Sequence, residues 1–290
     1  MNLNGWESDI VDQQDHNRTR VLALDTSTSA LTAALLEGGA LVDERHSQAE
    51  RNHSIKLLPT LQSLMADNGW SGKSTDLVAV GVGPGSYTGV RIAVTAGKTM
   101  AWAWDKPVIG VSSLEALALS GLQQAEQDGA AAGRVGRILV YPLMDARRGQ
   151  VYTAPFACNG SGAEALTDGV ERHGDDGIRL FSLVAEEASR ALEADADAEG
   201  ADHPHAAAAV WFVGDTGAQQ EALDGLQTQW GERIRVIPCG MEARWIGRLG
   251  LRAYAAGRRT DTHRLEPNYT QLAEAEAKLL AKERADRRQQ

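Results

Sequence analysis

The chain has 290 residues, of which 43% are hydrophobic, and a formal net charge of −10 at pH 7. This length suffices for one large domain or two lobes, and the acidic balance argues against a protein that holds nucleic acid by itself, because such affinity rests on clustered Lys and Arg. The two cysteines have no metal-binding spacing, and no apolar run is long enough for a membrane helix, so we expect a soluble, cytoplasmic protein.

Residues 1–19 are polar and show no apolar periodicity, so we expect a disordered leader. Residues 21–24 predict a short buried strand that ends at a cluster of one carboxylate and several hydroxyls, Asp25 to Ser29. Residues 30–36 and 40–45 predict two more strands, joined by a hairpin turn. The chain therefore opens with three strands, of which the second and third are antiparallel.

Residues 54–68 have the period of an amphipathic helix, with an apolar arc wider than one core face needs. The excess apolar surface indicates a second buried contact for this helix. The candidate contact residues are Ile55, Leu58, Leu61 and Met65.

The rest of the chain is organised around an apolar strand at 76–82, a glycine-rich turn, and an apolar helix at 88–104. The glycines permit a sharp turn, and Ser86 or Thr88 can cap the helix. Unpaired amides at the helix start could hold an anion or contact a neighbouring chain, but for this stretch taken alone a turn that only shapes the fold is the better explanation. The turn motif comprises Gly83, Gly85, Ser86, Gly89 and Arg91.

The helix at 88–104 carries small side chains that permit close approach of a second helix. That second helix could belong to the same domain or to a partner protein, and the periodicity allows both. The candidate contact residues are Ala93, Ala96, Gly97 and Met100.

The second half repeats the pattern of strand, hairpin and helices, which suggests two duplicated α/β lobes. We expect strands at 107–111, 137–143, 151–156, 210–213 and 235–237, and helices at 112–126, 182–194, 241–256 and 271–288. Residues 195–209 are acidic and rich in alanine, which is typical of a mobile insertion. The last helix is highly charged, with its basic residues near its C-terminal end.

Carboxylates at expected strand ends allow two interpretations. Asp25 with Thr26 and Ser27, and Asp215 in the second half, are the residue types with which a phosphotransferase holds a metal-bound nucleotide. Aspartates after strands also cap helices, and no lysine loop of the Walker type is present. No pair of histidines has the spacing of a metalloprotease, so we expect no metal site.

Several of these motifs together resemble the TsaB (YeaZ) family, partner subunits in bacterial threonylcarbamoyladenosine synthesis on tRNA. The resemblance is strong over residues 20–155 and looser beyond. The motifs that carry it are Leu22-Ala23-Leu24-Asp25-Thr26-Ser27-Thr28, Arg51-Asn52-His53-Ser54, the run from Gly83 to Ile92, the run from Pro107 to Leu114, and Asp145-Ala146-Arg147.

The resemblance implies an α/β fold of the actin, sugar kinase and Hsp70 class, with an N-terminal lobe at 20–116, a C-terminal lobe at 117–268 and a charged terminal helix at 269–290. It also implies a non-catalytic scaffold that binds the paralogue TsaD through its N-terminal helices. TsaD is understood to transfer a threonylcarbamoyl group to adenosine 37 of tRNAs that read codons starting with A, with the ATPase TsaE in the complex. The resemblance places ATP, the metal and tRNA contact with that complex, and a homodimer is possible without the partner.

Two features of the sequence weaken a catalytic role. Ser113 and Leu117 stand where TsaD carries its two metal-binding histidines, and neither side chain can replace an imidazole. The Asp25 cluster has Ser27 where phosphate loops of kinases have glycine. The alternatives to a scaffold are an independent phosphotransferase that uses Asp25 and Asp215, or a glycoprotein peptidase.

Overall fold

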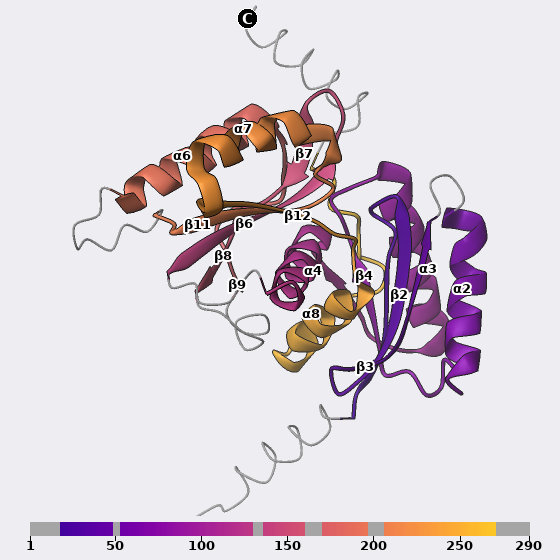
Figure 1. Ribbon diagram of the computed structural model, residues 1–290. Coiled ribbons are helices and arrows are strands. Elements are labelled where there is room, and N and C mark those ends of the chain that lie inside the picture. The colour runs from indigo at the N-terminus through magenta and orange to yellow at the C-terminus, as the bar shows by residue number, and fades with distance from the viewer. Residues whose placement is uncertain (1–17, 49–52, 130–135, 160–169, 197–205, 271–290) are drawn as a thin grey trace, which may run out of the picture.

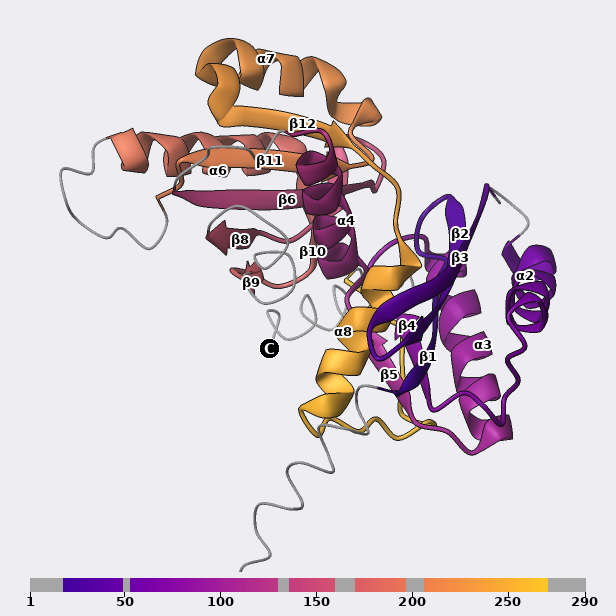
Figure 2. The ribbon, with the colours of Figure 1, turned by 60° about the horizontal axis from the view of Figure 1, so that its bottom comes forward.

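The computed structural model describes residues 18–48, 53–129, 136–159, 170–196 and 206–270. These residues form two lobes, each built on one β-sheet with helices on both faces (Figures 1 and 2). The predicted leader, apart from its last two residues, and the predicted helix at 271–288 lie outside the described residues, as does most of the predicted insertion at 195–209. Among the helices of the described part, none is long and apolar enough to span a membrane.

The sheet of the N-terminal lobe has the strand order β3-β2-β1-β4-β5. Strands β1, β2 and β3 pair antiparallel, whereas β4 and β5 run parallel to β1. Two helices, α2 and α3, cover one face of this sheet. The elements are β1 (Arg20–Asp25), β2 (Ala30–Glu37), β3 (Ala40–Gln48), α2 (His53–Asp67), β4 (Leu77–Gly81), α3 (Tyr87–Trp104) and β5 (Val108–Val111).

The sheet of the C-terminal lobe has the order β10-β7-β6-β11-β12, with β8 paired to β6 and β9 paired to β8. Helices α6 and α7 cover one face, and α4 packs on the other (Figure 1). The elements are α4 (Ser113–Gln127), β6 (Arg137–Asp145), β7 (Gln150–Thr153), β8 (Phe156–Asn159), β9 (Val170–Arg172), β10 (Gly177–Leu180), α6 (Phe181–Ala196), β11 (Ala209–Gly214), α7 (Gln220–Trp230) and β12 (Ile234–Pro238), with short 3₁₀ turns at Gly217–Gln219 and Gly231–Arg233.

Both lobes thus place the first strand in the middle, the hairpin strands on one side of it, and two parallel strands on the other. This common order agrees with the predicted duplication. One expected strand differs, because residues 151–156 form two strands, β7 and β8, with a break at Ala154 and Pro155. Pro155 has no backbone N–H to donate to the ladder, and proline is disfavoured inside a strand for that reason.

Helix α8 (Ala243–Ala255) packs on the N-terminal sheet, although its position in the sequence places it in the expected C-terminal lobe. Its buried residues Trp245, Ile246 and Leu249 share one hydrophobic cluster with strands β1, β2 and β4. It also lies against α4, which packs on the C-terminal sheet (Figure 2). The boundary between the lobes therefore does not follow the order of the chain.

The structure corrects part of the predicted partner surface. Leu61 and Met65 of α2 and Ala93 of α3 are 2%, 8% and 0% exposed, and they belong to the hydrophobic cluster between these helices and the sheet. Gly97 is also buried, and a Cβ there would lie 2.3 Å from Val80. These four residues hold their own lobe together, because the sheet needs an apolar cover on this face.

Candidate functional site

A cleft of about 970 Å³ lies between the lobes. The N-terminal lobe lines it with the polar end of β1 and the starts of α2 and α3, and the C-terminal lobe with the ends of β6, β11 and β12. Ligands of two-lobe α/β proteins bind in such clefts. Among the lining residues are Ser27, His53, Ser86, Asp145, Arg147, Asp215 and Cys239.

Asp25 does not face this cleft. Its carboxylate is fully buried and accepts hydrogen bonds from the Ser27 amide (2.7 Å), the Ser27 hydroxyl (2.6 Å) and the Ser113 hydroxyl (2.5 Å). Burial raises the pKa of the Asp25 carboxyl above its ordinary value, although the hydrogen bonds from Ser113 and Ser27 oppose that rise. The expectation that Asp25 binds a nucleotide directly is therefore wrong for this arrangement.

Thr26, like Asp25, does not line the cleft. Its side chain is fully buried, and its hydroxyl donates a hydrogen bond to the Gly89 carbonyl at 2.6 Å. Of the predicted nucleotide residues, only Ser27 and Asp215 line the cleft, one from each lobe. Asp145, the last residue of β6, also lines the cleft.

The turn at 83–89 is bound to the end of β1. The Ser86 amide donates to the Ser27 carbonyl at 2.7 Å, and the Ser113 hydroxyl accepts from the Gly83 amide at 3.0 Å. Ser86 caps α3 by accepting from the Gly89 amide at 3.3 Å, as one of the two predicted caps. The turn thus joins β1 to the starts of α3 and α4.

Close backbone contact explains two glycines of the motif. A Cβ on Gly89 would lie 1.9 Å from the Thr26 carbonyl oxygen, and a Cβ on Gly85 would lie 2.4 Å from the Ser27 carbonyl oxygen. Neither position has room for a side chain, because the neighbouring atom is backbone. Arg91 lies outside these contacts, with its guanidinium 4.7 Å from the centre of the exposed Tyr87 ring. These two glycines of the motif therefore have a structural role.

The turn after β6 brings a basic side chain to the cleft. Arg147 and Arg148 have φ of 65° and 56°, a left-handed conformation that is uncommon for residues other than glycine. The Asp145 carboxylate accepts from the Arg147 amide at 2.8 Å and so supports this turn. Asp145, Asp215 and Arg147 are all exposed, in contrast to Asp25.

Sequence reasoning did not predict His53 as a cleft residue. His53 is the first residue of α2 and is 8% exposed. Burial lowers the pKa of its imidazole, and a hydrogen bond to the backbone of Thr28 partly offsets that lowering. A single histidine ahead of a helix does not by itself indicate a cleft, and the resemblance, although it includes Arg51-Asn52-His53-Ser54, assigned His53 no role. Cys239, whose pKa burial raises to about 12, lines the cleft from the end of β12 and likewise had no sequence signal.

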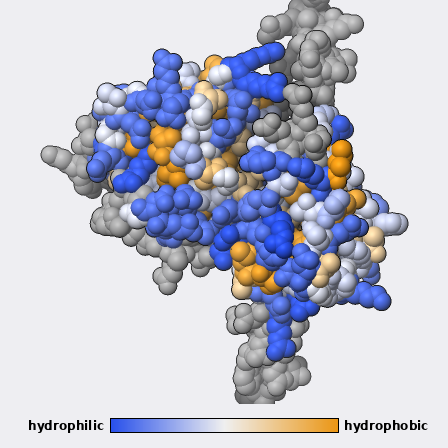
Figure 3. Space-filling view, turned by 45° about the vertical axis from the view of Figure 1, so that its right-hand side comes forward, coloured by the Kyte–Doolittle hydropathy of each residue, from blue (hydrophilic) through white to orange (hydrophobic). Residues whose placement is uncertain are grey.

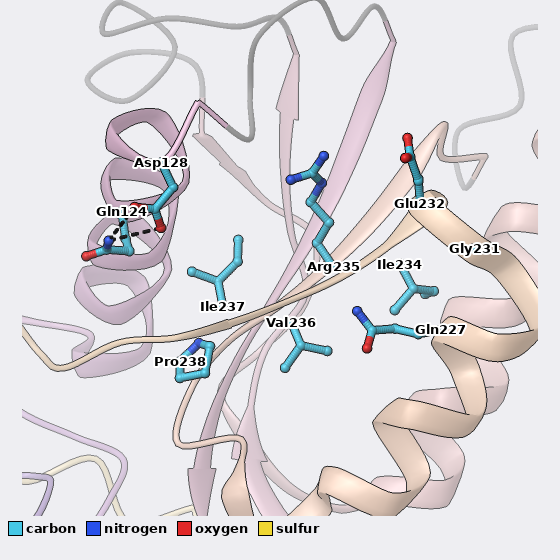
Figure 4. A pocket seen from close by; sticks show the side chains of 10 residues that line it. All are labelled: Gln124, Asp128, Gln227, Gly231, Glu232, Ile234, Arg235, Val236, Ile237 and Pro238. Atoms are coloured by element: carbon cyan, nitrogen blue, oxygen red, sulfur yellow. Dashed lines mark hydrogen bonds between the residues drawn. The ribbon is translucent and has the colours of Figure 1, made fainter.

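A second hollow, of about 610 Å³, follows the edge strand β12 of the C-terminal lobe (Figure 4). Arg235 and Ile237 point to the side of α4, and Gln227 of α7 lies on the other side of the strand (Figure 4). Gln124 donates to both carboxylate oxygens of Asp128, at 3.1 and 3.0 Å. None of the predicted site residues lines this hollow.

The outer side of α2 and α3 keeps part of the predicted contact surface. Ile55 and Leu58 are 71% and 53% exposed, and Ala96 and Met100 are half-buried. Figure 3 looks onto this side of the molecule and shows small apolar patches on a mainly polar surface. Trp102 near the end of α3 is 68% exposed. The sequence predicted that it lies in a helix, but it did not predict which face of the helix carries it.

No group of three or more His, Cys, Asp or Glu side chains that could hold a metal ion occurs within residues 18–48, 53–129, 136–159, 170–196 and 206–270. Ser113 and Leu117 are buried, with Ser113 bound to Asp25 and Leu117 in the core between the lobes. Two exposed carboxylates, Asp145 and Asp215, remain on the cleft wall.

The two lobes with one repeated strand order, and the cleft between them, define a protein of the actin, sugar kinase and Hsp70 fold class. A family model described as "TsaD: tRNA N6-adenosine threonylcarbamoyltransferase" matches residues 45–234. A Bacillus subtilis protein named "tRNA threonylcarbamoyladenosine biosynthesis protein TsaB" is 32% identical over 264 residues, 90% of this chain and 97% of that protein. The chain belongs to the TsaB family.

Other relatives cover less of the chain. TsaB of Escherichia coli is 34% identical over 137 residues, 47% of this chain and 54% of that protein. A tRNA N6-adenosine threonylcarbamoyltransferase of Anaeromyxobacter dehalogenans is 35% identical over 113 residues, 33% of this chain and 34% of that protein. The solved structure of YeaZ from Pseudomonas aeruginosa has a TM-score of 0.59 at 24% identity, covering 87% of this chain and 99% of that one, and shares the fold.

Proposed function

We propose that this chain serves tRNA threonylcarbamoyladenosine biosynthesis as a non-catalytic subunit that binds TsaD through the outer side of α2 and α3. The names of its relatives support the pathway. The observation that carries the binding surface is the exposure of two large aliphatic side chains, Ile55 and Leu58, one turn apart on α2. Side chains three residues apart on a helix lie on the same face, so both can enter one partner contact.

The state of the carboxylates supports a role without catalysis by this chain. Asp25 is fully buried and enclosed by Ser27 and Ser113, so it is closed to a ligand in the cleft, whereas Asp145 and Asp215 are exposed on the cleft wall. A magnesium-bound nucleotide is usually held by one or two carboxylates together with its own phosphates. Asp145 and Asp215 fit that chemistry, so ATP hydrolysis by the cleft is the second candidate function.

The surface on α2 can be tested by exchanging its exposed side chains for carboxylates. Burying an aliphatic side chain is worth about 1.5–3 kcal/mol, so we expect Ile55→Asp and Leu58→Asp each to weaken binding to TsaD by at least about tenfold. Isothermal titration calorimetry of the full chain with TsaD measures this. Circular dichroism should show unchanged folding, because both residues are exposed.

Leu183→Asp is the matched control, since Leu183 is 48% exposed on α6 of the other lobe. It should bind TsaD with the affinity of the wild type. Equal affinity for all three variants would contradict the proposed surface. ATP hydrolysis by the purified chain alone, abolished by Asp215→Asn, would instead favour the phosphotransferase.

A further inference from the structure

A buried carboxylate joins the two lobes outside the cleft. Asp176 lies in the turn between β9 and β10 of the C-terminal lobe, and its side chain is 8% exposed. One oxygen accepts from the Ser112 hydroxyl at 3.1 Å and from the Arg172 guanidinium at 2.7 Å. The other accepts from the Asn268 side-chain amide at 3.0 Å. Ser112 follows β5 of the N-terminal sheet, so these bonds cross from lobe to lobe.

A second carboxylate extends this contact to α8. Glu115, in the first turn of α4, pairs with Arg172 at 3.3 Å and with Arg252 of α8 at 3.0 Å. Burial alone would lower the pKa of Arg172, but Asp176 and Glu115 raise it, as expected for a guanidinium between two carboxylates. Asp176, Arg172 and Glu115 line a cavity of about 690 Å³ that shares no lining residue with the cleft.

Asn268 belongs to a segment, residues 258–270, that crosses the edge of the N-terminal lobe after α8; we refer to it as the strap. Thr260 forms a β-bridge with Val108 of the edge strand β5. Leu265 is 6% exposed within the hydrophobic cluster of α2 and α3. The Asn268 amide then donates to the Val82 carbonyl at 2.7 Å. The strap is thus fixed to the N-terminal lobe through the edge strand β5, the hydrophobic cluster of α2 and α3, and the Val82 carbonyl.

The strap is also held by α3. The Lys98 ammonium donates to the carbonyls of His263 and Leu265, at 3.0 and 2.9 Å. At its end, Tyr269 lies against Tyr87, the first residue of α3, with 5.4 Å between ring centres. One contiguous set of contacts therefore leads from α3 through the strap to Asp176.

We propose that Asp176 is an interlobe latch that holds the lobes at a fixed opening, and that the strap connects this latch to α3. Hinge motion draws the two domains of many cleft proteins together around a ligand. In this chain, side chains of both lobes bond to one another outside the cleft. If α3 belongs to the partner surface, TsaD binding would reach the strap, and this link to TsaD rests on the proposed function. The latch itself does not depend on it.

Removal of the latch can be measured on the free full-length chain. A hydrogen bond to a charged group contributes enough that its loss should speed hydrogen exchange of the backbone amide of residue 268, which donates to Val82, about tenfold or more. We expect this in Asp176→Ala and in Asn268→Ala, together with an increased radius of gyration in small-angle X-ray scattering. Because both variants break the same contact, the double variant should show less than the sum of the two effects.

Asp175→Ala is the matched control. It removes the same charge from the same turn, and the Asp175 side chain is exposed and forms no hydrogen bond or ion pair with the residues that the structure describes. Its exchange and scattering should equal those of the wild type. Lys98→Met should release the strap from α3 and speed the Asn268 amide without a change at Ser112.

Titration with TsaD separates the two proposals. If TsaD binds at α3, binding should slow exchange of the strap in the wild type and less so in Lys98→Met. If Asp176→Ala speeds hydrogen exchange in the free chain but the wild type does not bind TsaD, the latch is supported and the proposed function is contradicted. The latch is wrong if Asp176→Ala and Asn268→Ala both match Asp175→Ala in exchange and scattering.

Discussion

The carboxylate of Asp25 accepts three hydrogen bonds and has no exposed surface. Its neighbours include Gly81, where an added Cβ would lie 1.7 Å from a carboxylate oxygen. The sequence suggested Asp25, at a strand end, as a nucleotide-binding residue, and the structure buries it instead. Its role was not predictable, because Ser113, which completes the site, lies 88 residues further along the chain.

The buried state of Asp25 gives a pH dependence to stability. Because the pKa of Asp25 is raised in the folded chain, its contribution is fully present below the unfolded pKa of about 4 and is lost as pH rises through the folded pKa. The Asp25→Asn variant should not lose stability in this way, because the asparagine side chain does not ionise. We therefore expect the free energy of unfolding of the wild type to fall relative to Asp25→Asn as pH rises from about 4, by up to about 1.4 kcal/mol per unit.

Urea unfolding at a series of pH values measures this difference. Burial lowers the pKa of His53, and the charge of the nearby Asp25 opposes that lowering, so replacing Asp25 also changes the titration of His53. Both chains therefore carry His53→Gln in this comparison. Asp215→Asn, which replaces an exposed aspartate directly after β11 of the other lobe, is the control for the loss of a charge at a strand end. Parallel curves for the wild type and Asp25→Asn would contradict the argument.

At the scale of elements, α2 shows what an apolar pattern determines and what it leaves open. The helix carries two adjoining apolar stripes, and the sequence favoured Ile55, Leu58, Leu61 and Met65 as a contact for a partner. The structure divides them, since Leu57, Leu61, Leu64 and Met65 face the sheet and Ile55 and Leu58 face outward. Periodicity predicted the helix, but the choice of the buried stripe depends on the sheet below it.

This division of α2 predicts unequal costs for one chemical change. Leu61→Ala leaves a cavity in the core and should lower the free energy of unfolding by about 2–5 kcal/mol. Leu58→Ala removes an exposed side chain and should change it by no more than about 0.5 kcal/mol. Both residues lie in the same helix, so the change in helix propensity is equal. Similar midpoints in guanidinium unfolding would mean that Leu61 is not in the core.

At the scale of the molecule, the sequence predicted two lobes with a common pattern, and the structure gives both the same strand order. It did not predict that α8 returns to the first lobe, because an amphipathic helix shows that one face is buried but not on which sheet. Strands β9 and β10 and helix α7 were also missed. The two strands have only three and four residues and few buried side chains, so they lack the alternation that marks a strand.

The cluster that includes α4 and α8 contains residues of both sheets, among them Ala79 of β4 and Val213 of β11. A Cβ on Gly121 of α4 would lie 2.4 Å from Val213, and one on Gly250 of α8 would lie 2.6 Å from Ala79. The two helices therefore pack closely on opposite sheets and against each other. A shared core of this kind couples the stability of one lobe to that of the other.

This coupling can be tested at Trp245 of α8, which is 2% exposed and donates from its indole N–H to Gln123 of α4 at 3.0 Å. Trp245→Ala should destabilise the chain by about 3–5 kcal/mol. If the lobes unfold as one unit, hydrogen exchange in β1 and in β11 should accelerate by the same factor, and calorimetry should show a single transition. Acceleration in β1 alone would show that the C-terminal lobe is stable without the α8 contact, and that the two lobes are separate folding units.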